Sequence, residues 1–404
     1  MNRETVDALL TGMMASGDGV SDLLFIPGKP PLVEIHGRLQ DFPIDTPDSV
    51  LTPALIEQLA GLIMNGTERL RNEFAATGSC DCSYAIEDLA RFRVNIFRQN
   101  GRHSIVMRKL QSEVPSLDKL GLPPIFREIV KEKNGIVLVT GGTGTGKTTT
   151  LAAMIHELNR TEEIHILTLE DPIEFFHGHA KAAISQRELG KDFPTFADGL
   201  RAGLRQAPKV ILVGEIRDRE TLEIAMTASE TGHVVFSTLH TVNAGQTIHR
   251  ILGMFNREDE QQVRQRLSET LRYVVSQRLV NKIAGGRLLI TEIMGSSLRT
   301  RETIRYGESE NKTFHEIIEA GSTLGWHSFD QSLMSAFENR LIDEETALSC
   351  CNNKTKMRRS LDLALKARGV EAADAVSGLK MHIPDATPTV RPAAAALRIQ
   401  PQKK

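Results

Sequence analysis

The stretch VTGGTGTGKTTTLAAMI (residues 139–155) decides the fold, because it joins an apolar run to an amphipathic one through a turn rich in glycine and threonine. The run GIVLVT (135–140) has the β-branched, apolar character of a buried strand. The residues TTTLAAMIHELN (148–159) place Leu151, Met154, Ile155 and Leu158 on one face of a predicted helix. The sequence therefore predicts a strand, a tight glycine-rich turn and a helix in direct succession.

This turn matches the P-loop pattern GxxxxGK[ST], which is most credible between a strand and a helix. Glycines let successive backbone N–H groups face phosphate oxygens, and the helix N-terminus adds the positive end of its dipole. Lys147 is suited to reach the β- and γ-phosphates, and the Thr148 hydroxyl to ligate Mg²⁺. An incidental glycine-rich turn is the alternative, which the flanking elements disfavour. We predict nucleoside triphosphate binding by Gly141, Thr143, Gly144, Thr145, Gly146, Lys147, Thr148 and Thr149.

Composition limits the classes of protein to consider. The 404 residues leave room for two domains and a tail, and 49 basic against 51 acidic residues give a net charge of −2. This balance gives no strong electrostatic signal for nucleic acid binding. No apolar stretch approaches the roughly 20 residues of a membrane span, and the N-terminus lacks the apolar core of a signal peptide. We expect a cytoplasmic protein that does not insert into a membrane.

The cysteines do not indicate a metal site. Cys80 and Cys82 are separated by one residue, and Cys350 and Cys351 are adjacent, so neither pair has the CxxC spacing of a zinc module. Reduced thiols are the expected state in the cytoplasm. The histidine-containing stretch HGHA (177–180) is expected to be a solvated loop.

Residues 1–110 are predicted to form a first, mixed α/β domain. A helix is expected over Thr5–Met14, and a second one over TPALIEQLAGLIM (52–64), with Thr52 as its N-cap and Pro53 at its first position. Short connections between the strand-like runs favour an antiparallel sheet. These runs are SDLLFIPGKPPLVEIHGRLQDF, SCDCSYAIE, ARFRVNIFRQNG and HSIVMRKL.

A linker is expected over 111–122, where Pro, Gly and Ser are frequent. Residues 123–369 then alternate strands with helices, which is typical of a doubly wound parallel sheet. From about residue 250 onward we expect mostly helix, including a long amphipathic helix over 257–280. Residues 370–404 have little apolar periodicity and are predicted to be a disordered tail.

Polar residues follow three further strand-like runs. IHILTL (164–169) is followed by Glu170, VILV (210–213) by Gly214 and Glu215, and VVFSTL (234–239) by His240. Ligands of an open parallel sheet bind outside the carboxyl ends of its strands. We therefore expect these side chains to lie at the same edge as the P-loop.

Each of these side chains fits a role in phosphoryl transfer, which needs bound Mg²⁺, a positioned water and neutralised charge. Glu215 is predicted to activate water or to contact Mg²⁺ through water, although position 214 lacks the usual acid. Glu170 is the second acid, assisted by Asp171 and Glu174. His240 is placed to sense the γ-phosphate. The alternative for these acids is a solvated position in a turn.

The segment RFRVNIFRQNGRHSIVMRKL (91–110) is rich in arginine. Most of these side chains are expected to cover a solvated strand face. A charge-stabilising arginine finger delivered by a neighbouring subunit is the functional alternative.

Four stretches together resemble the bacterial secretion ATPases, and among them the motors that retract type IV pili. They are GGTGTGKTTTLAAMI, TLEDPIEFFH, VILVGEIRD and GHVVFSTLHT, which correspond in order and spacing to the family's Walker A motif, Asp box, Walker B motif and His box. The resemblance spans roughly residues 1–365, and the set of motifs is highly specific to this family.

The resemblance implies an α/β fold, with a PAS-like N-terminal domain and a RecA-like P-loop core that carries a helical C-terminal extension. It also implies a homohexamer that binds ATP and Mg²⁺ between an N-terminal domain and its own or a neighbouring core. The family's arginine fingers correspond to Arg93 and Arg108, with Arg98 as a nearby alternative. The implied location is the cytoplasmic face of the inner membrane, next to an integral platform protein and related pilus ATPases.

The sequence also departs from the family pattern. The long N-terminal region and the four-cysteine module of the extension and type II secretion motors are not found, which favours the retraction type. The motif AIRNLIRE is here RTRETIRY (299–306), the acidic DPD before the Walker B motif is APK (207–209), and SDLH is SDLL (21–24).

Three functions are therefore considered. The first is a hexameric ATPase motor for pilus retraction and twitching motility. The second is an accessory or regulatory ring that binds ATP and hydrolyses it weakly, since APK removes two carboxylates. The third is a RecA-like motor on nucleic acid, which is disfavoured by the near-neutral charge and by only one Trp and three Tyr.

Overall fold

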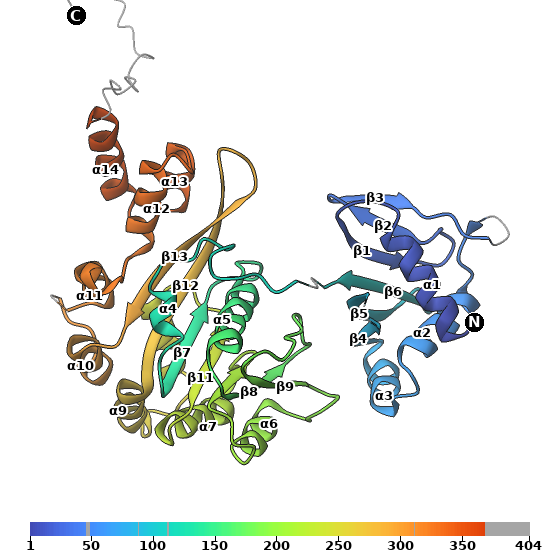
Figure 1. Ribbon diagram of the computed structural model, residues 1–404, viewed down its shortest axis with the longest axis horizontal. Helices are drawn as coiled ribbons and strands as arrows, with labels where there is room; N and C mark the ends of the chain where they lie inside the picture. Colours follow the sequence, from blue (N-terminus) through green and yellow to red (C-terminus); the bar gives the residue numbers. More distant parts are fainter. Residues whose placement is uncertain (46–48, 88, 111–112, 311, 368–404) are drawn as a thin grey trace, which may run out of the picture.

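The computed structural model describes residues 1–45, 49–87, 89–110, 113–310 and 312–367. Figure 1 shows two α/β bodies joined by an extended segment, with the N-terminal body in blue. The predicted tail over 370–404 lies outside the described residues, as does the start of the predicted linker.

The N-terminal body is built on an antiparallel sheet. Within the described residues, its six strands have the order β3-β2-β1-β6-β5-β4, and each neighbouring pair is antiparallel, as predicted. Thr52 caps α2, because its hydroxyl accepts a hydrogen bond from the Leu55 amide at 3.3 Å. The strands are Val20–Phe25 (β1), Leu32–Ile35 (β2), Arg38–Asp41 (β3), Ser79–Ile86 (β4), Ala90–Gln99 (β5) and Arg102–Lys109 (β6). The helices are Arg3–Met14 (α1), Pro53–Ile63 (α2) and Glu68–Thr77 (α3).

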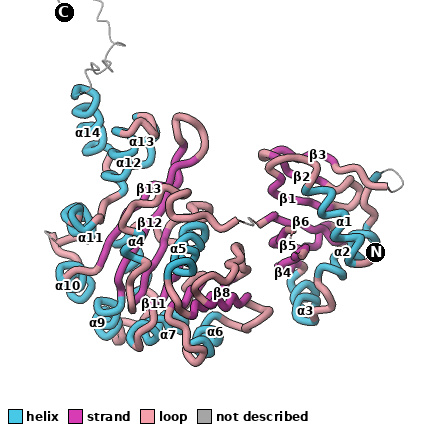
Figure 2. Tube along the Cα trace, viewed as in Figure 1, coloured by secondary structure: helices cyan, strands magenta, loops and turns pink. Residues whose placement is uncertain are grey.

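The second body contains a mostly parallel sheet. Its described strands have the order β13-β12-β7-β11-β10-β8-β9, and only the β12–β13 pair is antiparallel. Figure 2 shows the strands side by side with loops at their ends. They are Gly135–Thr140 (β7), His165–Glu170 (β8), Ala183–Glu188 (β9), Val210–Val213 (β10), Val234–Leu239 (β11), Leu271–Asn281 (β12) and Arg287–Gly295 (β13).

Helices cover both faces of this sheet, which explains why β7, β10 and β11 are buried at every position. One apolar core joins Ile136 and Leu138 of β7 to α6–α9, and another joins Val137 and Val139 to α4 and α5. The predicted doubly wound arrangement is thereby confirmed. The covering helices are Phe126–Ile129 (α4), Lys147–Thr161 (α5), Phe196–Gly203 (α6), Arg219–Glu230 (α7), Ala244–Leu252 (α8) and Glu260–Thr270 (α9).

The long helix predicted over 257–280 is wrong in its second half. Helix α9 ends at Thr270, and β12 begins at Leu271. Val274 and Val275 are fully buried between β7, which is parallel to β12, and the antiparallel hairpin partner β13. Hydrogen bonds to a neighbouring strand on each side stabilise β12 as a strand, although its sequence also has helical periodicity. Its β-branched residues fit a strand that is covered on both faces. The chain after residue 250 is therefore less helical than predicted.

The C-terminal helices α12–α14, orange to red in Figure 1, pack against the far end of the β12–β13 hairpin. Val280 of β12 and Ile290 of β13 share an apolar core with Phe329, Leu333 and Leu361. No helix in the described ranges is both long and apolar enough to cross a bilayer. The α-helices that follow β13 are Leu298–Tyr306 (α10), Phe314–Ala320 (α11), Phe329–Glu338 (α12), Glu344–Cys350 (α13) and Lys354–Ala367 (α14).

Candidate nucleotide site

The P-loop connects β7 to the N-terminus of α5. Gly141, Gly144 and Gly146 have φ angles of +147°, +77° and +88°, which other residue types rarely adopt. A Cβ at position 141 would also lie 2.7 Å from the carbonyl oxygen of Gln277 in β12. Gly146 caps α5 without a side-chain hydrogen bond, so the first N–H groups of the helix face the loop. This geometry is suited to hold an anion.

The side chain of Lys147 folds back over this loop. Its ammonium group donates to the carbonyl oxygens of Gly141 at 3.0 Å and Gly142 at 2.9 Å. Burial lowers the pKa of Lys147, while the nearby carboxylates of Glu215 and Glu174 act in the opposite direction. The ammonium group thus lies at the centre of the loop, within the electrostatic reach of two acids.

Glu215 follows β10 and lies between the side chains of Arg217 and His240. Its Oε1 forms an ion pair with Arg217, and its Oε2 is 3.8 Å from Nε2 of His240. Burial and the neighbouring charge of Lys147 lower the pKa of His240, while the carboxylate of Glu215 acts in the opposite direction. The structure therefore brings Lys147, Glu215 and His240 together, as the strand-end argument predicted.

Glu170 lies at the end of β8 but is enclosed by polar protein groups. Its carboxyl accepts hydrogen bonds from the Thr168 hydroxyl at 2.6 Å and from Nε2 of Gln186 at 3.3 Å. Burial raises the pKa of Glu170 to about 7. Among the described residues, no hydrogen bond or ion pair joins it to Lys147 or Glu215. Glu170 is thus buried and is held by Thr168 and Gln186 instead of contacting Lys147 or Glu215.

The loop after β8 brings Arg93 of the N-terminal body close to the site. Burial raises the pKa of Asp171, and the nearby guanidinium groups of Arg93 and Arg217 partly offset this effect. Arg93 is exposed on β5 and lies opposite Arg108 of β6 in the strand register. Arg108, however, donates to Asp22 at 2.9 Å, and Arg98 stacks on Phe74 of α3. Of Arg93, Arg98 and Arg108, only Arg93 interacts with this loop among the described residues.

Two features of this site were missed or left unexplained by the sequence argument. Arg217, two residues after Glu215, was not singled out, although its place in VGEIRD marks it as a neighbour of the acid. Gly214, at the position of the usual acid, lies next to the end of β8, where its amide donates to the Leu169 carbonyl oxygen at 2.8 Å. A Cβ there would lie 3.2 Å from the Leu169 carbonyl oxygen. A larger residue at position 214 would therefore require a small shift of the neighbouring strand end.

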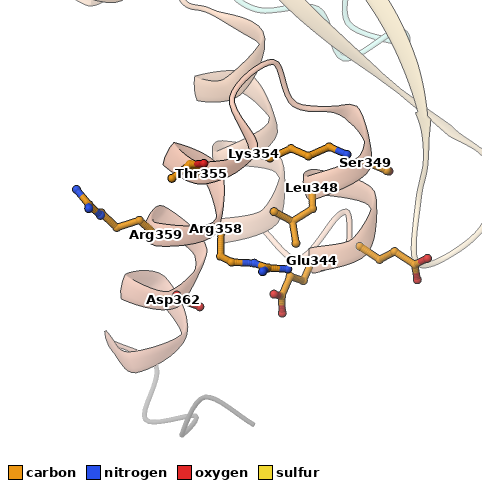
Figure 3. Close-up of a pocket in the computed structure, with 9 residues that line it drawn as sticks. Glu344, Leu348, Ser349, Lys354, Thr355, Arg358, Arg359 and Asp362 are labelled. Carbon is orange, nitrogen blue, oxygen red and sulfur yellow. The ribbon is translucent and has the colours of Figure 1, made fainter. Parts of the chain in front are cut away.

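A large hollow elsewhere in the molecule is not part of this site. It lies between α13 and α14, and Figure 3 shows that acidic and basic side chains line it together. Glu344 and Leu348 come from α13, while Lys354, Arg358 and Asp362 come from α14. None of its lining residues belongs to the P-loop or to the strand-end cluster. The hollow is therefore separate from the predicted nucleotide site at the sheet edge.

Comparison with known proteins agrees with the motifs. The family model of type II/IV secretion system proteins matches residues 82–338. The type IV pilus retractation ATPase PilT of Pseudomonas aeruginosa is 41% identical over 329 residues, which is 81% of this chain and 93% of the relative. The type IV pilus ATPase PilU of the same organism is 34% identical over 374 residues, covering 92% of this chain and 96% of that one.

A solved structure supports the same relationship. The crystal structure of the pilus retraction motor PilT with bound ADP matches with a TM-score of 0.77 and 38% identity, covering 88% of this chain and 99% of the other. The predicted resemblance and the α/β fold with a P-loop core are thus confirmed.

Proposed function

The chain belongs to the type II/IV secretion system protein family, and from this premise we propose that it is a homohexameric ATPase motor that powers type IV pilus retraction and twitching motility. The observation that carries the proposal is the meeting of Lys147, Glu215 and His240 at one edge of the parallel sheet. In a P-loop ATPase this edge receives the triphosphate. We further propose the domain limits 1–110 (PAS-like), 111–122 (linker) and 123–369 (ATPase core with C-terminal extension).

ATP binding is assigned to the P-loop and the first turn of α5. The residues that contact the phosphates are Gly141, Thr143, Gly144, Thr145, Gly146, Lys147, Thr148 and Thr149. The Thr148 hydroxyl, with Glu215 acting through water, suits Mg²⁺, which binds proteins through few direct ligands and keeps several waters. Phosphate oxygens of the nucleotide would supply further ligands. Bound Mg²⁺ supplies neutralisation of phosphate charge.

Glu215 is proposed to orient and deprotonate the attacking water. Its carboxylate must first be released from Arg217, to which it is paired in the structure. His240 is proposed to report the state of the γ-phosphate through a hydrogen bond of its imidazole ring. Glu170 is proposed to support the loop that carries Asp171 and Glu174 rather than to touch water.

Arg93 is proposed to neutralise the charge that develops on the transferred phosphoryl group. Its support is its electrostatic effect on Asp171 of the same chain. Arg108 is proposed to act only after it leaves Asp22, which now holds it in the N-terminal body. Domain closure on ATP, relayed around the ring, then provides the mechanical step.

The proposed working place is the cytoplasmic face of the inner membrane, beside an integral pilus platform protein. Related pilus ATPases are further proposed partners, since PilT and PilU occur in one organism. The resemblance to pilus motors supports these assignments.

Steady-state ATP hydrolysis and solution mass, measured for the wild type and Glu215→Gln, test this function. We expect a hexamer in both cases, with turnover at least about 100-fold lower in the variant, because the water loses its base. ATP binding should persist. Undiminished turnover in Glu215→Gln would mean that a group other than Glu215 activates the water.

An accessory motor with weak hydrolysis is the second candidate. The match to PilU spans more of this chain than the match to PilT. The stretch 207–209 before β10 reads APK, and Ala207 adopts a left-handed φ of +53°. A hexamer that binds ATP but turns it over slowly in the wild type would favour this candidate over the principal motor.

A further inference from the structure

Arg91 of β5 and Glu188 of β9 form a buried ion pair between the two bodies. Only 9% of Arg91 and 6% of Glu188 are exposed. Ser83 of β4 completes the contact: its hydroxyl donates to Glu188 at 2.7 Å and accepts from Arg91 at 3.2 Å. The edge of the N-terminal sheet is thus fixed to the edge strand of the ATPase sheet.

The same pair also holds the loop that follows β8. The Ile173 amide donates to Oε2 of Glu188 at 3.4 Å, and the Arg91 guanidinium lies 4.5 Å from the ring centroid of Phe176. Asp171 and Glu174 belong to this loop. One contact therefore joins β5, β9 and the acidic loop of the nucleotide site.

Strand geometry connects this contact to Arg93. Side chains two positions apart on a strand point to the same face, so Arg91 and Arg93 both face the ATPase body. Phe92 and Val94, which alternate with them, are fully buried in the N-terminal core. Fixing Arg91 therefore fixes the direction in which Arg93 leaves β5, toward Asp171.

The contact is costly to bury. Nε and Nη1 of Arg91 are buried without a hydrogen-bond partner among the described residues. Buried charges lose hydration, and an ion pair repays this loss only with good geometry and full hydrogen bonding. A purely stabilising interface would be served better by apolar side chains, so the pair is suited to define alignment.

We infer that the Arg91–Glu188 pair is a latch between the two bodies of one chain, and that Arg91 is a positioning residue for Arg93. This inference rests on the proposed role of Arg93. The latch sets the distance between Arg93 and the phosphates without touching ATP itself.

A kinetic cycle tests this inference. We expect Arg91→Ala to lower kcat by up to about 100-fold with little change in KM, because a small misplacement of a charge-stabilising group has that effect. Arg91→Ala added to Arg93→Ala should cause no further loss of kcat, since both changes remove one function. Independent, multiplying losses would overturn the inference. Arg102→Ala is the matched control, since Arg102 is exposed on β6 and forms no ion pair with the described residues.

Charge reversal separates alignment from folding. The double variant Arg91→Glu with Glu188→Arg should recover kcat relative to either single change, with melting temperatures measured on all three. If Arg93→Ala keeps its turnover, the proposed role of Arg93 fails. In that case, hydrogen exchange of residues 171–176 still tests whether the Arg91–Glu188 pair holds the loop. Faster exchange in Arg91→Ala would support the latch, and unchanged exchange would refute it.

Discussion

Lys147 shows how one ammonium group both shapes the P-loop and prepares it for a ligand. In the structure it binds two loop carbonyls, and phosphate oxygens would offer it stronger, charge-assisted partners. We expect Lys147→Ala to weaken ATP binding by about 100-fold, equivalent to about 3 kcal/mol. Titration with a fluorescent ATP analogue measures this loss, and Lys29→Ala, an exposed lysine in the N-terminal body, is the control. Unchanged affinity would refute the P-loop assignment.

Glu170 predicts a pH dependence of stability. Its pKa is about 7 in the folded chain and 4.5 in the reference state, so the folded state holds an extra proton between these values. Stability therefore decreases as pH rises from about 4.5 to 7, by up to about 3 kcal/mol, and then levels off. We expect Glu170→Gln to abolish this decrease in stability, because the amide side chain does not titrate.

Thermal melts at two pH values test the effect. Glu170→Gln should melt above the wild type at pH 8, where the wild type buries a charge, and close to it at pH 5. A variant that melts equally far below the wild type at both values would show that the carboxylate is stabilised by its two hydrogen bonds instead.

At the residue scale, the sequence predicted the groups whose position follows from strand polarity. Glu215 and His240 end neighbouring parallel strands, so their meeting is dictated by topology. The Arg91–Glu188 pair was not predictable in this way, since it joins residues 97 positions apart in two bodies. The partner of Arg108 was missed because Asp22 lies on β1, far away in the sequence although in the same sheet.

At the scale of elements, the sequence predicted the fully buried strands well. β7, β10 and β11 are continuous apolar runs, and their burial on both faces explains that composition. β9, with the sequence AISQRE, was not predicted, because an edge strand needs no apolar run. β12 was mistaken for helix because the preceding α9 residues are helical and the partner β13 lies further along the chain.

Glu292 of β13 gives a prediction about helix placement. Its side chain, in a residue only 3% exposed, accepts a hydrogen bond from the Ala244 amide at 3.0 Å, at the first residue of α8. Burial raises the pKa of Glu292. Hydrogen bonds from the backbone amides of Ala244 and of Phe329, at the start of α12, lower this pKa in part. We expect Glu292→Ala to destabilise the protein by about 2–3 kcal/mol, because buried amides lose their acceptor.

Chemical denaturation measures this change. Glu310→Ala, an exposed acid after α10, should stay within about 0.5 kcal/mol of the wild type. An equally small effect of Glu292→Ala would mean that α8 and α12 keep their positions through apolar packing alone.

At the scale of the whole molecule, the proposed ring predicts how subunits depend on one another. If closure of one subunit is relayed to the next, an inactive subunit blocks more than its own turnover. Adding Glu215→Gln chains to wild-type chains should therefore lower ATPase activity more steeply than the fraction of variant. A strictly proportional decrease would indicate independent sites, and an unchanged solution mass across the mixtures is the control.

The two-body organisation was predictable because Pro, Gly and Ser are frequent over 111–122, where the linker is expected. How the bodies contact one another was not, since it depends on few side chains from distant segments. Sequence patterns record burial within a body more clearly than contact between bodies, where polar residues meet.

The outer edge of β13 has one further consequence. The Ile293 amide, on the side away from β12, donates to the His327 carbonyl oxygen at 2.9 Å in an isolated bridge. Part of the free edge is thereby closed by the chain's own segment before α12. Unpaired edges promote aggregation when copies of a protein are crowded. This short bridge thus leaves fewer backbone groups of β13 open to pairing with a strand of a second copy.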